Sequence, residues 1–463
     1  MFYFITMINI FKDLPKKTTF GVLLFCMIFM AKQSSAQKQL NSYIQQGLVS
    51  NESIKEQEFL LKRSIYALQE AKSMFLPSVT FSTTYTKADG GRTIDFPTGD
   101  LFNAAYATLN QLTGSNSFPQ LQNQSILLNP DNFYDAKFRT SLPILNAELV
   151  YNKRIKSQQV DIQKAEVLMY KRELVKEIKT AYYNYLKATN AIRIYQSFLK
   201  LLEEGERVNQ SLFNNNKINR TAVIRSQNEV SKINASLIAA QKTEEAARYY
   251  FNFLLNRPLT DTILTDDVPS LPAQDNLLIG DVSSREELAK LEIAKGINQN
   301  LTGLAKSYLI PKIGTSLDLG SQGFDWKFND KSRYYLLGVS LEWNLFSSGR
   351  NNYKIRQSIA SEQATSAQTD HVAQQLLTEL NVRRANLQSA VAQYKAAQSQ
   401  LKTSQTYYND MTKLYKEGMA IYIELLDAQN QWVDAQLQSN IALFDTWVSF
   451  TAIERANASF NLQ

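Results

Sequence analysis

Two long stretches of the chain contain neither glycine nor proline, one between Pro143 and Gly205 and the other between Gly349 and Gly418. Each stretch exceeds 60 residues, whereas an average helix has about 11–12. Glycine and proline are the residues that interrupt helices most strongly. We therefore expect a continuous helix in each stretch, about 90–100 Å long at the helical rise per residue. Such lengths predict rods rather than a row of globular domains.

The order of segments occurs twice along the chain. A short helix, an X-Pro break, an extended region, a very long helix, a turn and a medium helix are followed by the same series. Gln227-Asn228 corresponds to Gln429-Asn430 at a spacing of 202 residues. Apolar residues seven apart predict left-handed coiled-coil packing. The same offset relates one such heptad row to another, formed by Ile178, Tyr185, Ile192 and Leu199 and then by Leu380, Leu387, Tyr394 and Leu401.

The amino terminus has the order of a secretory signal peptide. Lysines precede a short apolar run, which ends at Ser34-Ser35-Ala36, and we expect cleavage after Ala36. The sole cysteine, Cys26, falls within this signal. We therefore divide the chain into four parts: a signal peptide at 1–36, a first repeat at 37–257, a linker at 258–282 and a second repeat at 283–463.

Each repeat has two segments in which apolar and polar residues alternate, as expected of strands with one apolar face. A strand of about 9–11 residues can cross an outer membrane with its apolar face toward lipid. A half-buried sheet in a soluble domain would show the same alternation. The apolar positions are Val79, Phe81 and Tyr85; Tyr134, Phe138 and Leu142; Ile313, Leu317 and Leu319; and Tyr335, Leu337, Val339 and Leu341.

The number of strands bears on the assembly. Four strands per chain cannot close a membrane barrel, because known barrels need about eight or more and an open edge is not tolerated in lipid. Three chains would supply 12. The fold expected is therefore mainly α, with duplicated coiled-coil helices forming an α-barrel and a homotrimer sharing a 12-stranded β-barrel.

Residues 87–132 are unusually long for the connection of a hairpin. This segment contains Gly90-Gly91, Pro97, Pro119 and Pro130 among several aromatic residues. Two interpretations remain: a variable surface loop, or an ordered cap over the mouth of a duct.

The duplicated plan resembles the TolC-type outer-membrane efflux duct family, the outer membrane factors, over residues 40–460. Phe75-Leu-Pro-Ser leads into a strand, and the second long hairpin closes with Tyr415-Lys-Glu-Gly-Met-Ala-Ile-Tyr-Ile-Glu-Leu-Leu-Asp-Ala-Gln. The resemblance implies a homotrimeric duct in the outer membrane of a Gram-negative bacterium, extending into the periplasm. Such ducts work with a periplasmic adaptor (membrane fusion) protein and an inner-membrane pump, and they export small molecules or proteins.

The resemblance also implies a site at the periplasmic tip. Gly418 matches the turn glycine of the family, and Tyr415 matches a tip tyrosine. Glu424 and Asp427 match a carboxylate pair that narrows the closed pore, and their i, i+3 spacing puts both on one helix face. A solvated acidic helix face is the alternative interpretation of this pair.

The turn residues are candidate contacts of the adaptor. Asn216 replaces the turn glycine in the first repeat, which is compatible with a left-handed turn. Met419 and Ala420 follow Gly418 in the second repeat. Ala420 stands where the best-known member of the family has an arginine, so an ion-pair lock is not expected at this position.

Other function classes are disfavoured by composition. One histidine and one cysteine leave no Cys/His metal site and no nucleophile–base set, so we expect no enzyme activity, no metal and no cofactor. Lysines and glutamates are interspersed rather than grouped in basic blocks, which gives no nucleic-acid footprint. The remaining alternative to a duct is an exported periplasmic coiled-coil adaptor or scaffold with a small soluble β-domain.

Overall fold

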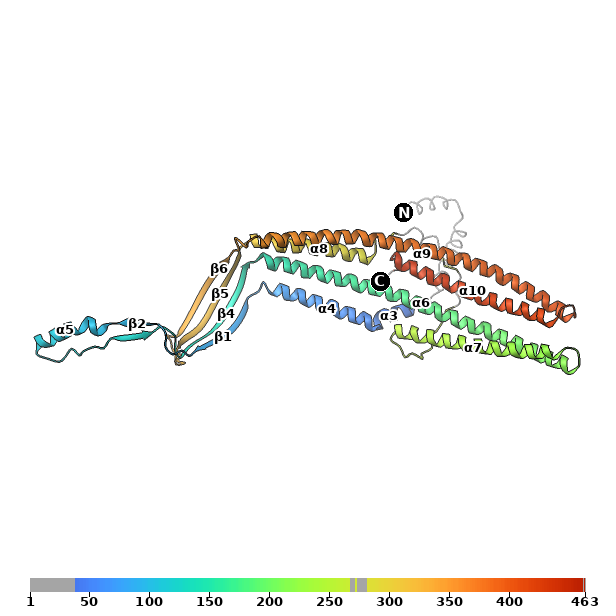
Figure 1. Cartoon of the computed structure of the whole chain (residues 1–463), viewed down its shortest axis with the longest axis horizontal. Coiled ribbons are helices and arrows are strands. Elements are labelled where there is room, and N and C mark those ends of the chain that lie inside the picture. The colour runs from blue at the N-terminus through green and yellow to red at the C-terminus, as the bar shows by residue number, and fades with distance from the viewer. Residues whose placement is uncertain (1–37, 267–270, 273–280, 461, 463) are drawn as a thin grey trace, which may run out of the picture. The chain divides into compact units, whose positions relative to one another are not determined.

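The computed structural model describes residues 38–266, 271–272, 281–460 and 462 (Figure 1). The predicted signal peptide and residues 267–270 and 273–280 of the predicted linker lie outside the described residues. The chain divides into two compact units. The helical unit contains the described residues up to Ser64, Gln158–Gly296 and the described residues from Glu362 onward; the strand unit contains Ile65–Ser157 and Ile297–Ser361.

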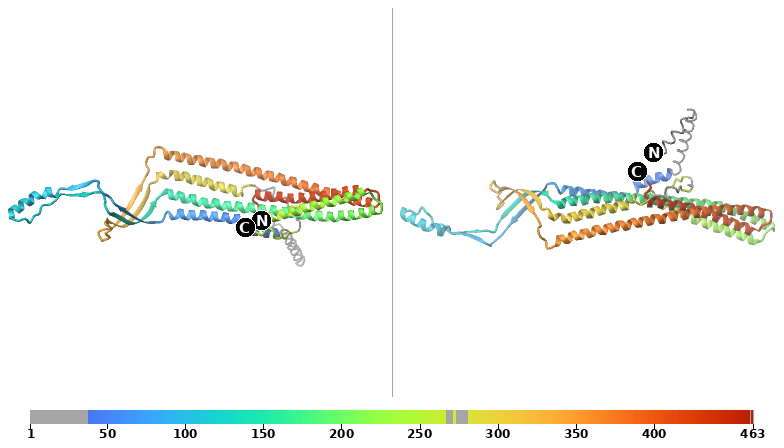
Figure 2. Two further views of the ribbon diagram at one scale, coloured as in Figure 1. Left: turned by 60° about the horizontal axis from the view of Figure 1, so that its bottom comes forward. Right: turned by 90° about the horizontal axis from the view of Figure 1, so that it is seen from above.

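The two very long helices predicted from the glycine- and proline-free stretches are confirmed. They are α6 (Ala147–Asn214), with 68 residues, and α9 (Arg350–Lys416), with 67. Each is followed by a turn and a helix of 35 residues, α7 (Arg220–Leu254) and α10 (Tyr422–Ala456). In the helical unit α7 runs beside α6, and α10 runs beside α9 (Figure 2). The bounds of α7 recur in α10 at the offset that relates Gln227 to Gln429.

The short helix predicted at the start of the first repeat is two helices, α3 (Lys38–Ser50) and α4 (Glu52–Ser73). Asn51 separates them. Its side-chain oxygen accepts the backbone N–H of Ser53 at 2.9 Å, and its amide donates to the carbonyl oxygen of Leu254 at 2.8 Å. The asparagine therefore caps the start of α4 and also bonds the end of α7. The corresponding helix of the second repeat, α8 (Glu286–Lys306), continues into the 3₁₀ turn η1 (Ser307–Leu309).

The core of the helical unit confirms the predicted heptad rows. Ile178 and Leu380, which occupy equivalent positions, are both fully buried. Around Ile178 the side chains of α3, α6 and α7 pack together, and a β-carbon at Gly47 would clash with the Ile178 side chain. Glycine therefore permits α3 to approach α6 closely. The buried aromatic members of this cluster are Tyr43, Tyr182, Tyr183, Tyr185, Phe251 and Phe444.

The strand unit holds the four predicted strands in one antiparallel sheet of order β1-β4-β5-β6. Their register places Phe81 opposite Phe138, Phe138 opposite Leu319, and Leu319 opposite Tyr335, so one apolar row crosses all four strands. The opposite face carries an ion pair between Arg139 and Asp318 at 2.6 Å. The strands are β1 (Ser78–Thr86), β4 (Phe133–Leu145), β5 (Lys312–Phe324) and β6 (Arg333–Glu342).

The segment between β1 and β4 contains regular structure that the sequence did not predict. It holds a helix, α5 (Thr98–Thr113), between two short strands, β2 (Thr93–Phe96) and β3 (Gln124–Leu127). These two strands pair with each other in a separate sheet. The expectation of four strands per chain is therefore wrong in number, although the four longer strands lie where the alternation predicts. Such short strands span too few residues to show a period in the sequence.

The described start of the predicted linker packs onto the helical unit. The Asp266 carboxylate accepts the backbone N–H of Gln39 at 3.1 Å, and the backbone N–H of Asp266 donates to the Tyr182 hydroxyl at 2.9 Å. Asp266 thereby caps α3.

Within the described ranges, no helix combines the length and the apolarity needed to cross a membrane.

Candidate functional site

The turns of the two helical hairpins share one backbone geometry. At the first turn, the N–H groups of Asn216 and Lys217 donate to the carbonyls of Phe213 and Leu212 at 2.9 and 2.8 Å. This pattern is a Schellman motif, in which a left-handed residue ends the helix. Asn216 has φ +56°.

The second turn repeats this pattern at the equivalent place in the second repeat. The backbone N–H of Gly418 donates to the carbonyl of Tyr415 at 3.1 Å, and the N–H of Met419 donates to the carbonyl of Leu414 at 2.9 Å. Gly418 has φ +76°. The left-handed turn inferred for Asn216 and the turn inferred for Gly418 therefore both exist, and both residues are exposed.

The two hairpins are joined near their turns by a polar contact. The Tyr415 hydroxyl of α9 donates to the side-chain oxygen of Asn209 of α6 at 3.3 Å. Asn209 is only 1% exposed. The Tyr415 ring lies 6.2 Å from the ring of Tyr422 at the start of α10. Burial raises the pKa of both hydroxyls, so both stay neutral donors at physiological pH.

The carboxylates of Glu424 and Asp427 lie on the exposed face of α10. Between them, Leu425 and Leu426 are buried. The Glu424 carboxylate accepts the backbone N–H of Ile421 at 3.0 Å, and Asp427 accepts the side-chain amide of Gln431 at 2.7 Å. Glu424 thus satisfies a free N–H at the start of the helix, where negative charge is also favoured by the helix dipole. It has a structural role in addition to any role in a pore.

A groove of about 840 Å³ lies between the two turns. One wall comes from the first hairpin and the other from the second, which includes Tyr415, Gly418 and Ala420. Met419 is 66% exposed. The groove carries positive charge from Lys217, Arg225 and Lys416. It is therefore a mixed apolar and basic surface to which both repeats contribute.

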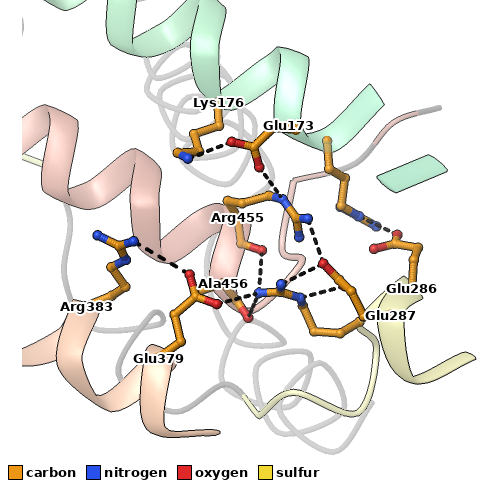
Figure 3. A network of polar contacts seen from close by, with 10 residues as sticks. Glu173, Lys176, Glu286, Glu287, Glu379, Arg383, Arg455 and Ala456 are labelled. Atoms are coloured by element: carbon orange, nitrogen blue, oxygen red, sulfur yellow. Dashed lines mark hydrogen bonds and ion pairs between the residues drawn. The ribbon is translucent and has the colours of Figure 1, made fainter. Parts of the chain in front are cut away.

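A network of charged side chains, largely buried at Arg285, Arg455 and Glu287, holds four elements of the helical unit together (Figure 3). Arg455 at the end of α10 donates to Glu173 of α6 at 3.0 Å and to Glu287 of α8 at 2.7 Å. Arg285, only 4% exposed, binds both oxygens of Glu287 at 2.7 and 2.9 Å and donates to the carbonyl of Ala456 at 3.0 Å. The bidentate geometry fixes both direction and distance.

Electrostatics at Glu287 follow from this arrangement. Burial by itself would raise its pKa, but hydrogen bonds from Arg285 and Arg455 outweigh burial and lower the pKa to about 2. Glu287 is therefore ionised at any physiological pH. Glu379 of α9 extends the network, at 3.8 Å from Arg285 and 3.6 Å from Arg383.

Neither this network nor the role of Asn209 was predicted from the sequence. Charged residues are frequent on all these helices, so no sequence pattern distinguishes the residues of the network from the others. The one signal available was the constant offset between the two repeats, which would have placed Asn209 close to the turns. That offset could not show that the asparagine is buried.

Among the described residues, no three or more His, Cys, Asp or Glu side chains come together in a way that could hold a metal ion.

Comparisons with known proteins give the class. Residues 283–446 match the family model described as outer membrane efflux protein. No curated protein matches the sequence. The fold is similar to that of the outer-membrane channel OprN, with a TM-score of 0.73 and 18% identity over 91% of this chain and 90% of that one.

Two further channels have similar folds. For the open-state MtrE channel of Neisseria gonorrhoeae the TM-score is 0.71 at 17% identity, over 90% of this chain and 88% of that one. For the CmeC channel of Campylobacter jejuni it is 0.71 at 13% identity, over 90% and 85%. At these identities the likeness establishes the fold.

The fold is that of outer-membrane channels, and part of the chain matches the outer membrane efflux protein family. The second repeat of this chain carries the outer membrane efflux protein domain, which confirms the resemblance to the TolC-type family. OprN, CmeC and MtrE are channels, which fits the expectation of no catalytic role.

Proposed function

We propose that three copies of this chain form a duct that crosses the outer membrane and extends into the periplasm. The sheet carries the proposal: an apolar row crosses all four strands on one face, while β1 and β6 are both at open edges. An apolar face is stable toward lipid, but open edges there are not. Pairing β1 of one copy with β6 of the next removes every edge and gives a 12-stranded barrel. A soluble β-domain on a scaffold would not need this face.

The test compares two neighbouring positions on β6. Val339 belongs to the apolar face and Ser340 to the opposite face. Lysine on a lipid face costs about 2–4 kcal/mol near the membrane centre, whereas lysine in the lumen is tolerated. We expect Val339→Lys to reduce the amount of trimer in outer membranes and Ser340→Lys to leave it unchanged. Fractionation followed by light scattering in detergent gives the readout. A wild-type chain released without detergent as a monomer overturns the proposal.

We further propose that Glu424 and Asp427 narrow the periplasmic end of the pore. Both are exposed in the single chain and share one face of α10. Three copies would place six carboxylates around the axis, which favours cations. Glu424→Gln is the informative variant, because glutamine keeps the bond to the Ile421 N–H while removing the charge. With Asp427→Asn, it should reduce cation selectivity in bilayer conductance. Glu417→Gln, also exposed at the turn, serves as the control. Unchanged selectivity would leave only a solvated acidic face.

The turns are the proposed docking site of a periplasmic adaptor, which in turn binds an inner-membrane pump. Asn216, Gly418, Met419 and Ala420 lie at or beside the groove between the hairpins. Its apolar and basic lining suits a helical partner tip with apolar and acidic residues. Met419→Glu should abolish capture of the adaptor while the trimer remains. Lys402→Glu, exposed on α9 away from the turn, should not. The exported material is a small molecule or a protein.

A further inference from the structure

Residues 87–132, here called the excursion, connect β1 to β4 and have a defined structure. Asn103 of α5 donates to the carbonyl of Leu121 at 2.9 Å and accepts the N–H of the same residue at 2.7 Å. Two helical turns later, Asn110 does the same with Phe118, at 2.7 and 3.0 Å. Each amide therefore pairs with both backbone groups of one residue in the returning chain. These hydrogen bonds hold one face of α5 against the returning segment.

The start of α5 is fixed in a similar way. The Asn123 side chain accepts the backbone N–H groups of Gly99 and Asp100 at 2.9 and 3.1 Å and donates to the Asp100 carboxylate at 2.9 Å. A β-carbon at Gly99 would lie 2.6 Å from the carbonyl oxygen of Leu121. Asn123 thus caps the helix from the returning chain. These contacts give α5 a defined orientation.

The opposite face of α5 is apolar and exposed. Leu101, Ala105, Thr108 and Leu112 follow one another at spacings of four, three and four residues, the spacing of a coiled-coil seam. Leu101 is 67% exposed and Leu112 is 78% exposed. Both leucines thus point away from the chain that α5 packs against. Small residues between them permit another helix to approach closely.

The charged residues of the excursion lie near its two ends, at Lys87, Asp89, Arg92, Asp95, Asp100 and Asp131. Residues 101–130 contain no Asp, Glu, Lys, Arg or His, although charged residues make up 20% of the chain. A surface that meets its own copies around a symmetry axis repeats each charge, and like charges repel. A neutral apolar seam is therefore complementary to itself. Helices that lie on a membrane surface usually carry Lys or Arg on their polar face, and α5 has neither.

The excursion is attached to an edge of the sheet. β1 is the edge strand, and only residues 87–92 separate it from β2. The excursion begins at the end of β1 that lies away from α4 (Figure 1). In the proposed trimer this edge meets the next copy, so each excursion starts beside a junction between copies.

We propose that the exposed seam of α5 binds the same seam on the other copies of this chain, so that three helices close or narrow the outer mouth of the duct. This inference rests on the trimer proposed above. The partner that we propose for each seam is the same seam on another copy of the chain. Two observations favour this partner: the seam is neutral, and the excursion is attached at an edge strand.

The test uses cysteine cross-linking in intact outer membranes, because the chain has no cysteine after the expected signal. Thr108→Cys lies in the seam, and Ala107→Cys is the matched control, since adjacent residues point about 100° apart around the helix. Both positions are exposed in the single chain. After oxidation with copper phenanthroline, we expect most of the Thr108→Cys chain to move from the monomer band to a dimer band. The Ala107→Cys chain should stay monomeric.

A second variant tests the closure itself. Leu101→Glu with Leu112→Glu would place six carboxylates in the seam and separate the helices. We expect higher single-channel conductance than for the wild type, with Ala107→Glu unchanged. Equal cross-linking at 107 and 108, or none at 108, in a chain that still forms trimers overturns the inference and leaves the duct intact. Absence of trimers in the wild type overturns the duct instead.

Discussion

Tyr415 of α9 donates a hydrogen bond to the side chain of Asn209 of α6, and this contact joins the two helical hairpins near their turns. The acceptor is buried, so no water replaces the bond without rearrangement. The two residues belong to different repeats. Any movement that separates the hairpins at their turns must break this bond.

Tyr415→Phe removes the hydrogen bond and keeps the ring. We expect a loss of about 1 kcal/mol at the contact, because Asn209 is left buried with one fewer partner. In bilayers the variant should spend more time in high-conductance states. Tyr407→Phe, on the same helix but at an exposed position, is the control. Identical conductance for the two variants would show that the bond does not restrain the hairpins.

Arg455→Met tests the charged network at the end of α10. Glu287 would keep Arg285, but Glu173 would lose its partner on α10. Glu173 is 41% exposed and would keep Lys176, so the loss corresponds to hydrogen bonds to charged groups, about 1.5–3 kcal/mol. The midpoint of thermal loss of helical circular dichroism should fall clearly. Arg207→Met breaks the exposed Arg207–Glu204 pair within α6, and exposed pairs contribute little. A similar fall in both variants would mean that burial does not govern these pairs.

The low pKa of Glu287 makes part of the stability depend on pH. Its pKa is about 2 in the folded chain, whereas an unperturbed glutamate has a pKa of 4.5. The folded state therefore favours the ionised form. The contribution is fully present above about pH 4.5 and is lost as the pH falls toward 2. It amounts to up to about 3 kcal/mol.

The Glu287→Gln variant should therefore lose stability at neutral pH, and its thermal midpoint should change less than that of the wild type between pH 5 and pH 2.5, a range set by the two pKa values. Glu292→Gln, at an exposed position of the same helix, should keep the wild-type dependence. A parallel pH profile for Glu287→Gln and the wild type contradicts the assignment.

The long helices were predictable because they depend on local properties. Unbroken helix propensity over such long stretches leaves no alternative, and the heptad rows alone identify Ile178 and Leu380 as core residues. The same holds for the longer strands, whose alternation is long enough to be read. The turn at Asn216 was predictable because few residues adopt its backbone conformation.

Other features depend on contacts between distant segments. Asn51, which caps the start of α4, also bonds Leu254 in the last turn of α7. Helix α5 depends on Asn103 and Asn110 meeting a returning chain, although asparagine is a weak helix former. Arg285 and Arg455 become buried only when four helices assemble. No local pattern in the sequence carries this information, so these features could not be predicted.

The two hairpin turns offer an internal comparison of one backbone conformation with two residues. Gly418 has φ +76°, and among the described residues no atom lies within 4 Å of the place that its β-carbon would take. Gly418→Ala therefore introduces backbone strain without a steric clash. We expect it to destabilise the second turn by roughly 1 kcal/mol. Gly418→Asn should cost less, because Asn216 already occupies the equivalent conformation at φ +56°. Hydrogen exchange of the N–H groups of Met419 and Ala420 measures the opening of this turn directly. Faster exchange in Gly418→Ala than in Gly418→Asn supports the strain argument, and equal exchange refutes it.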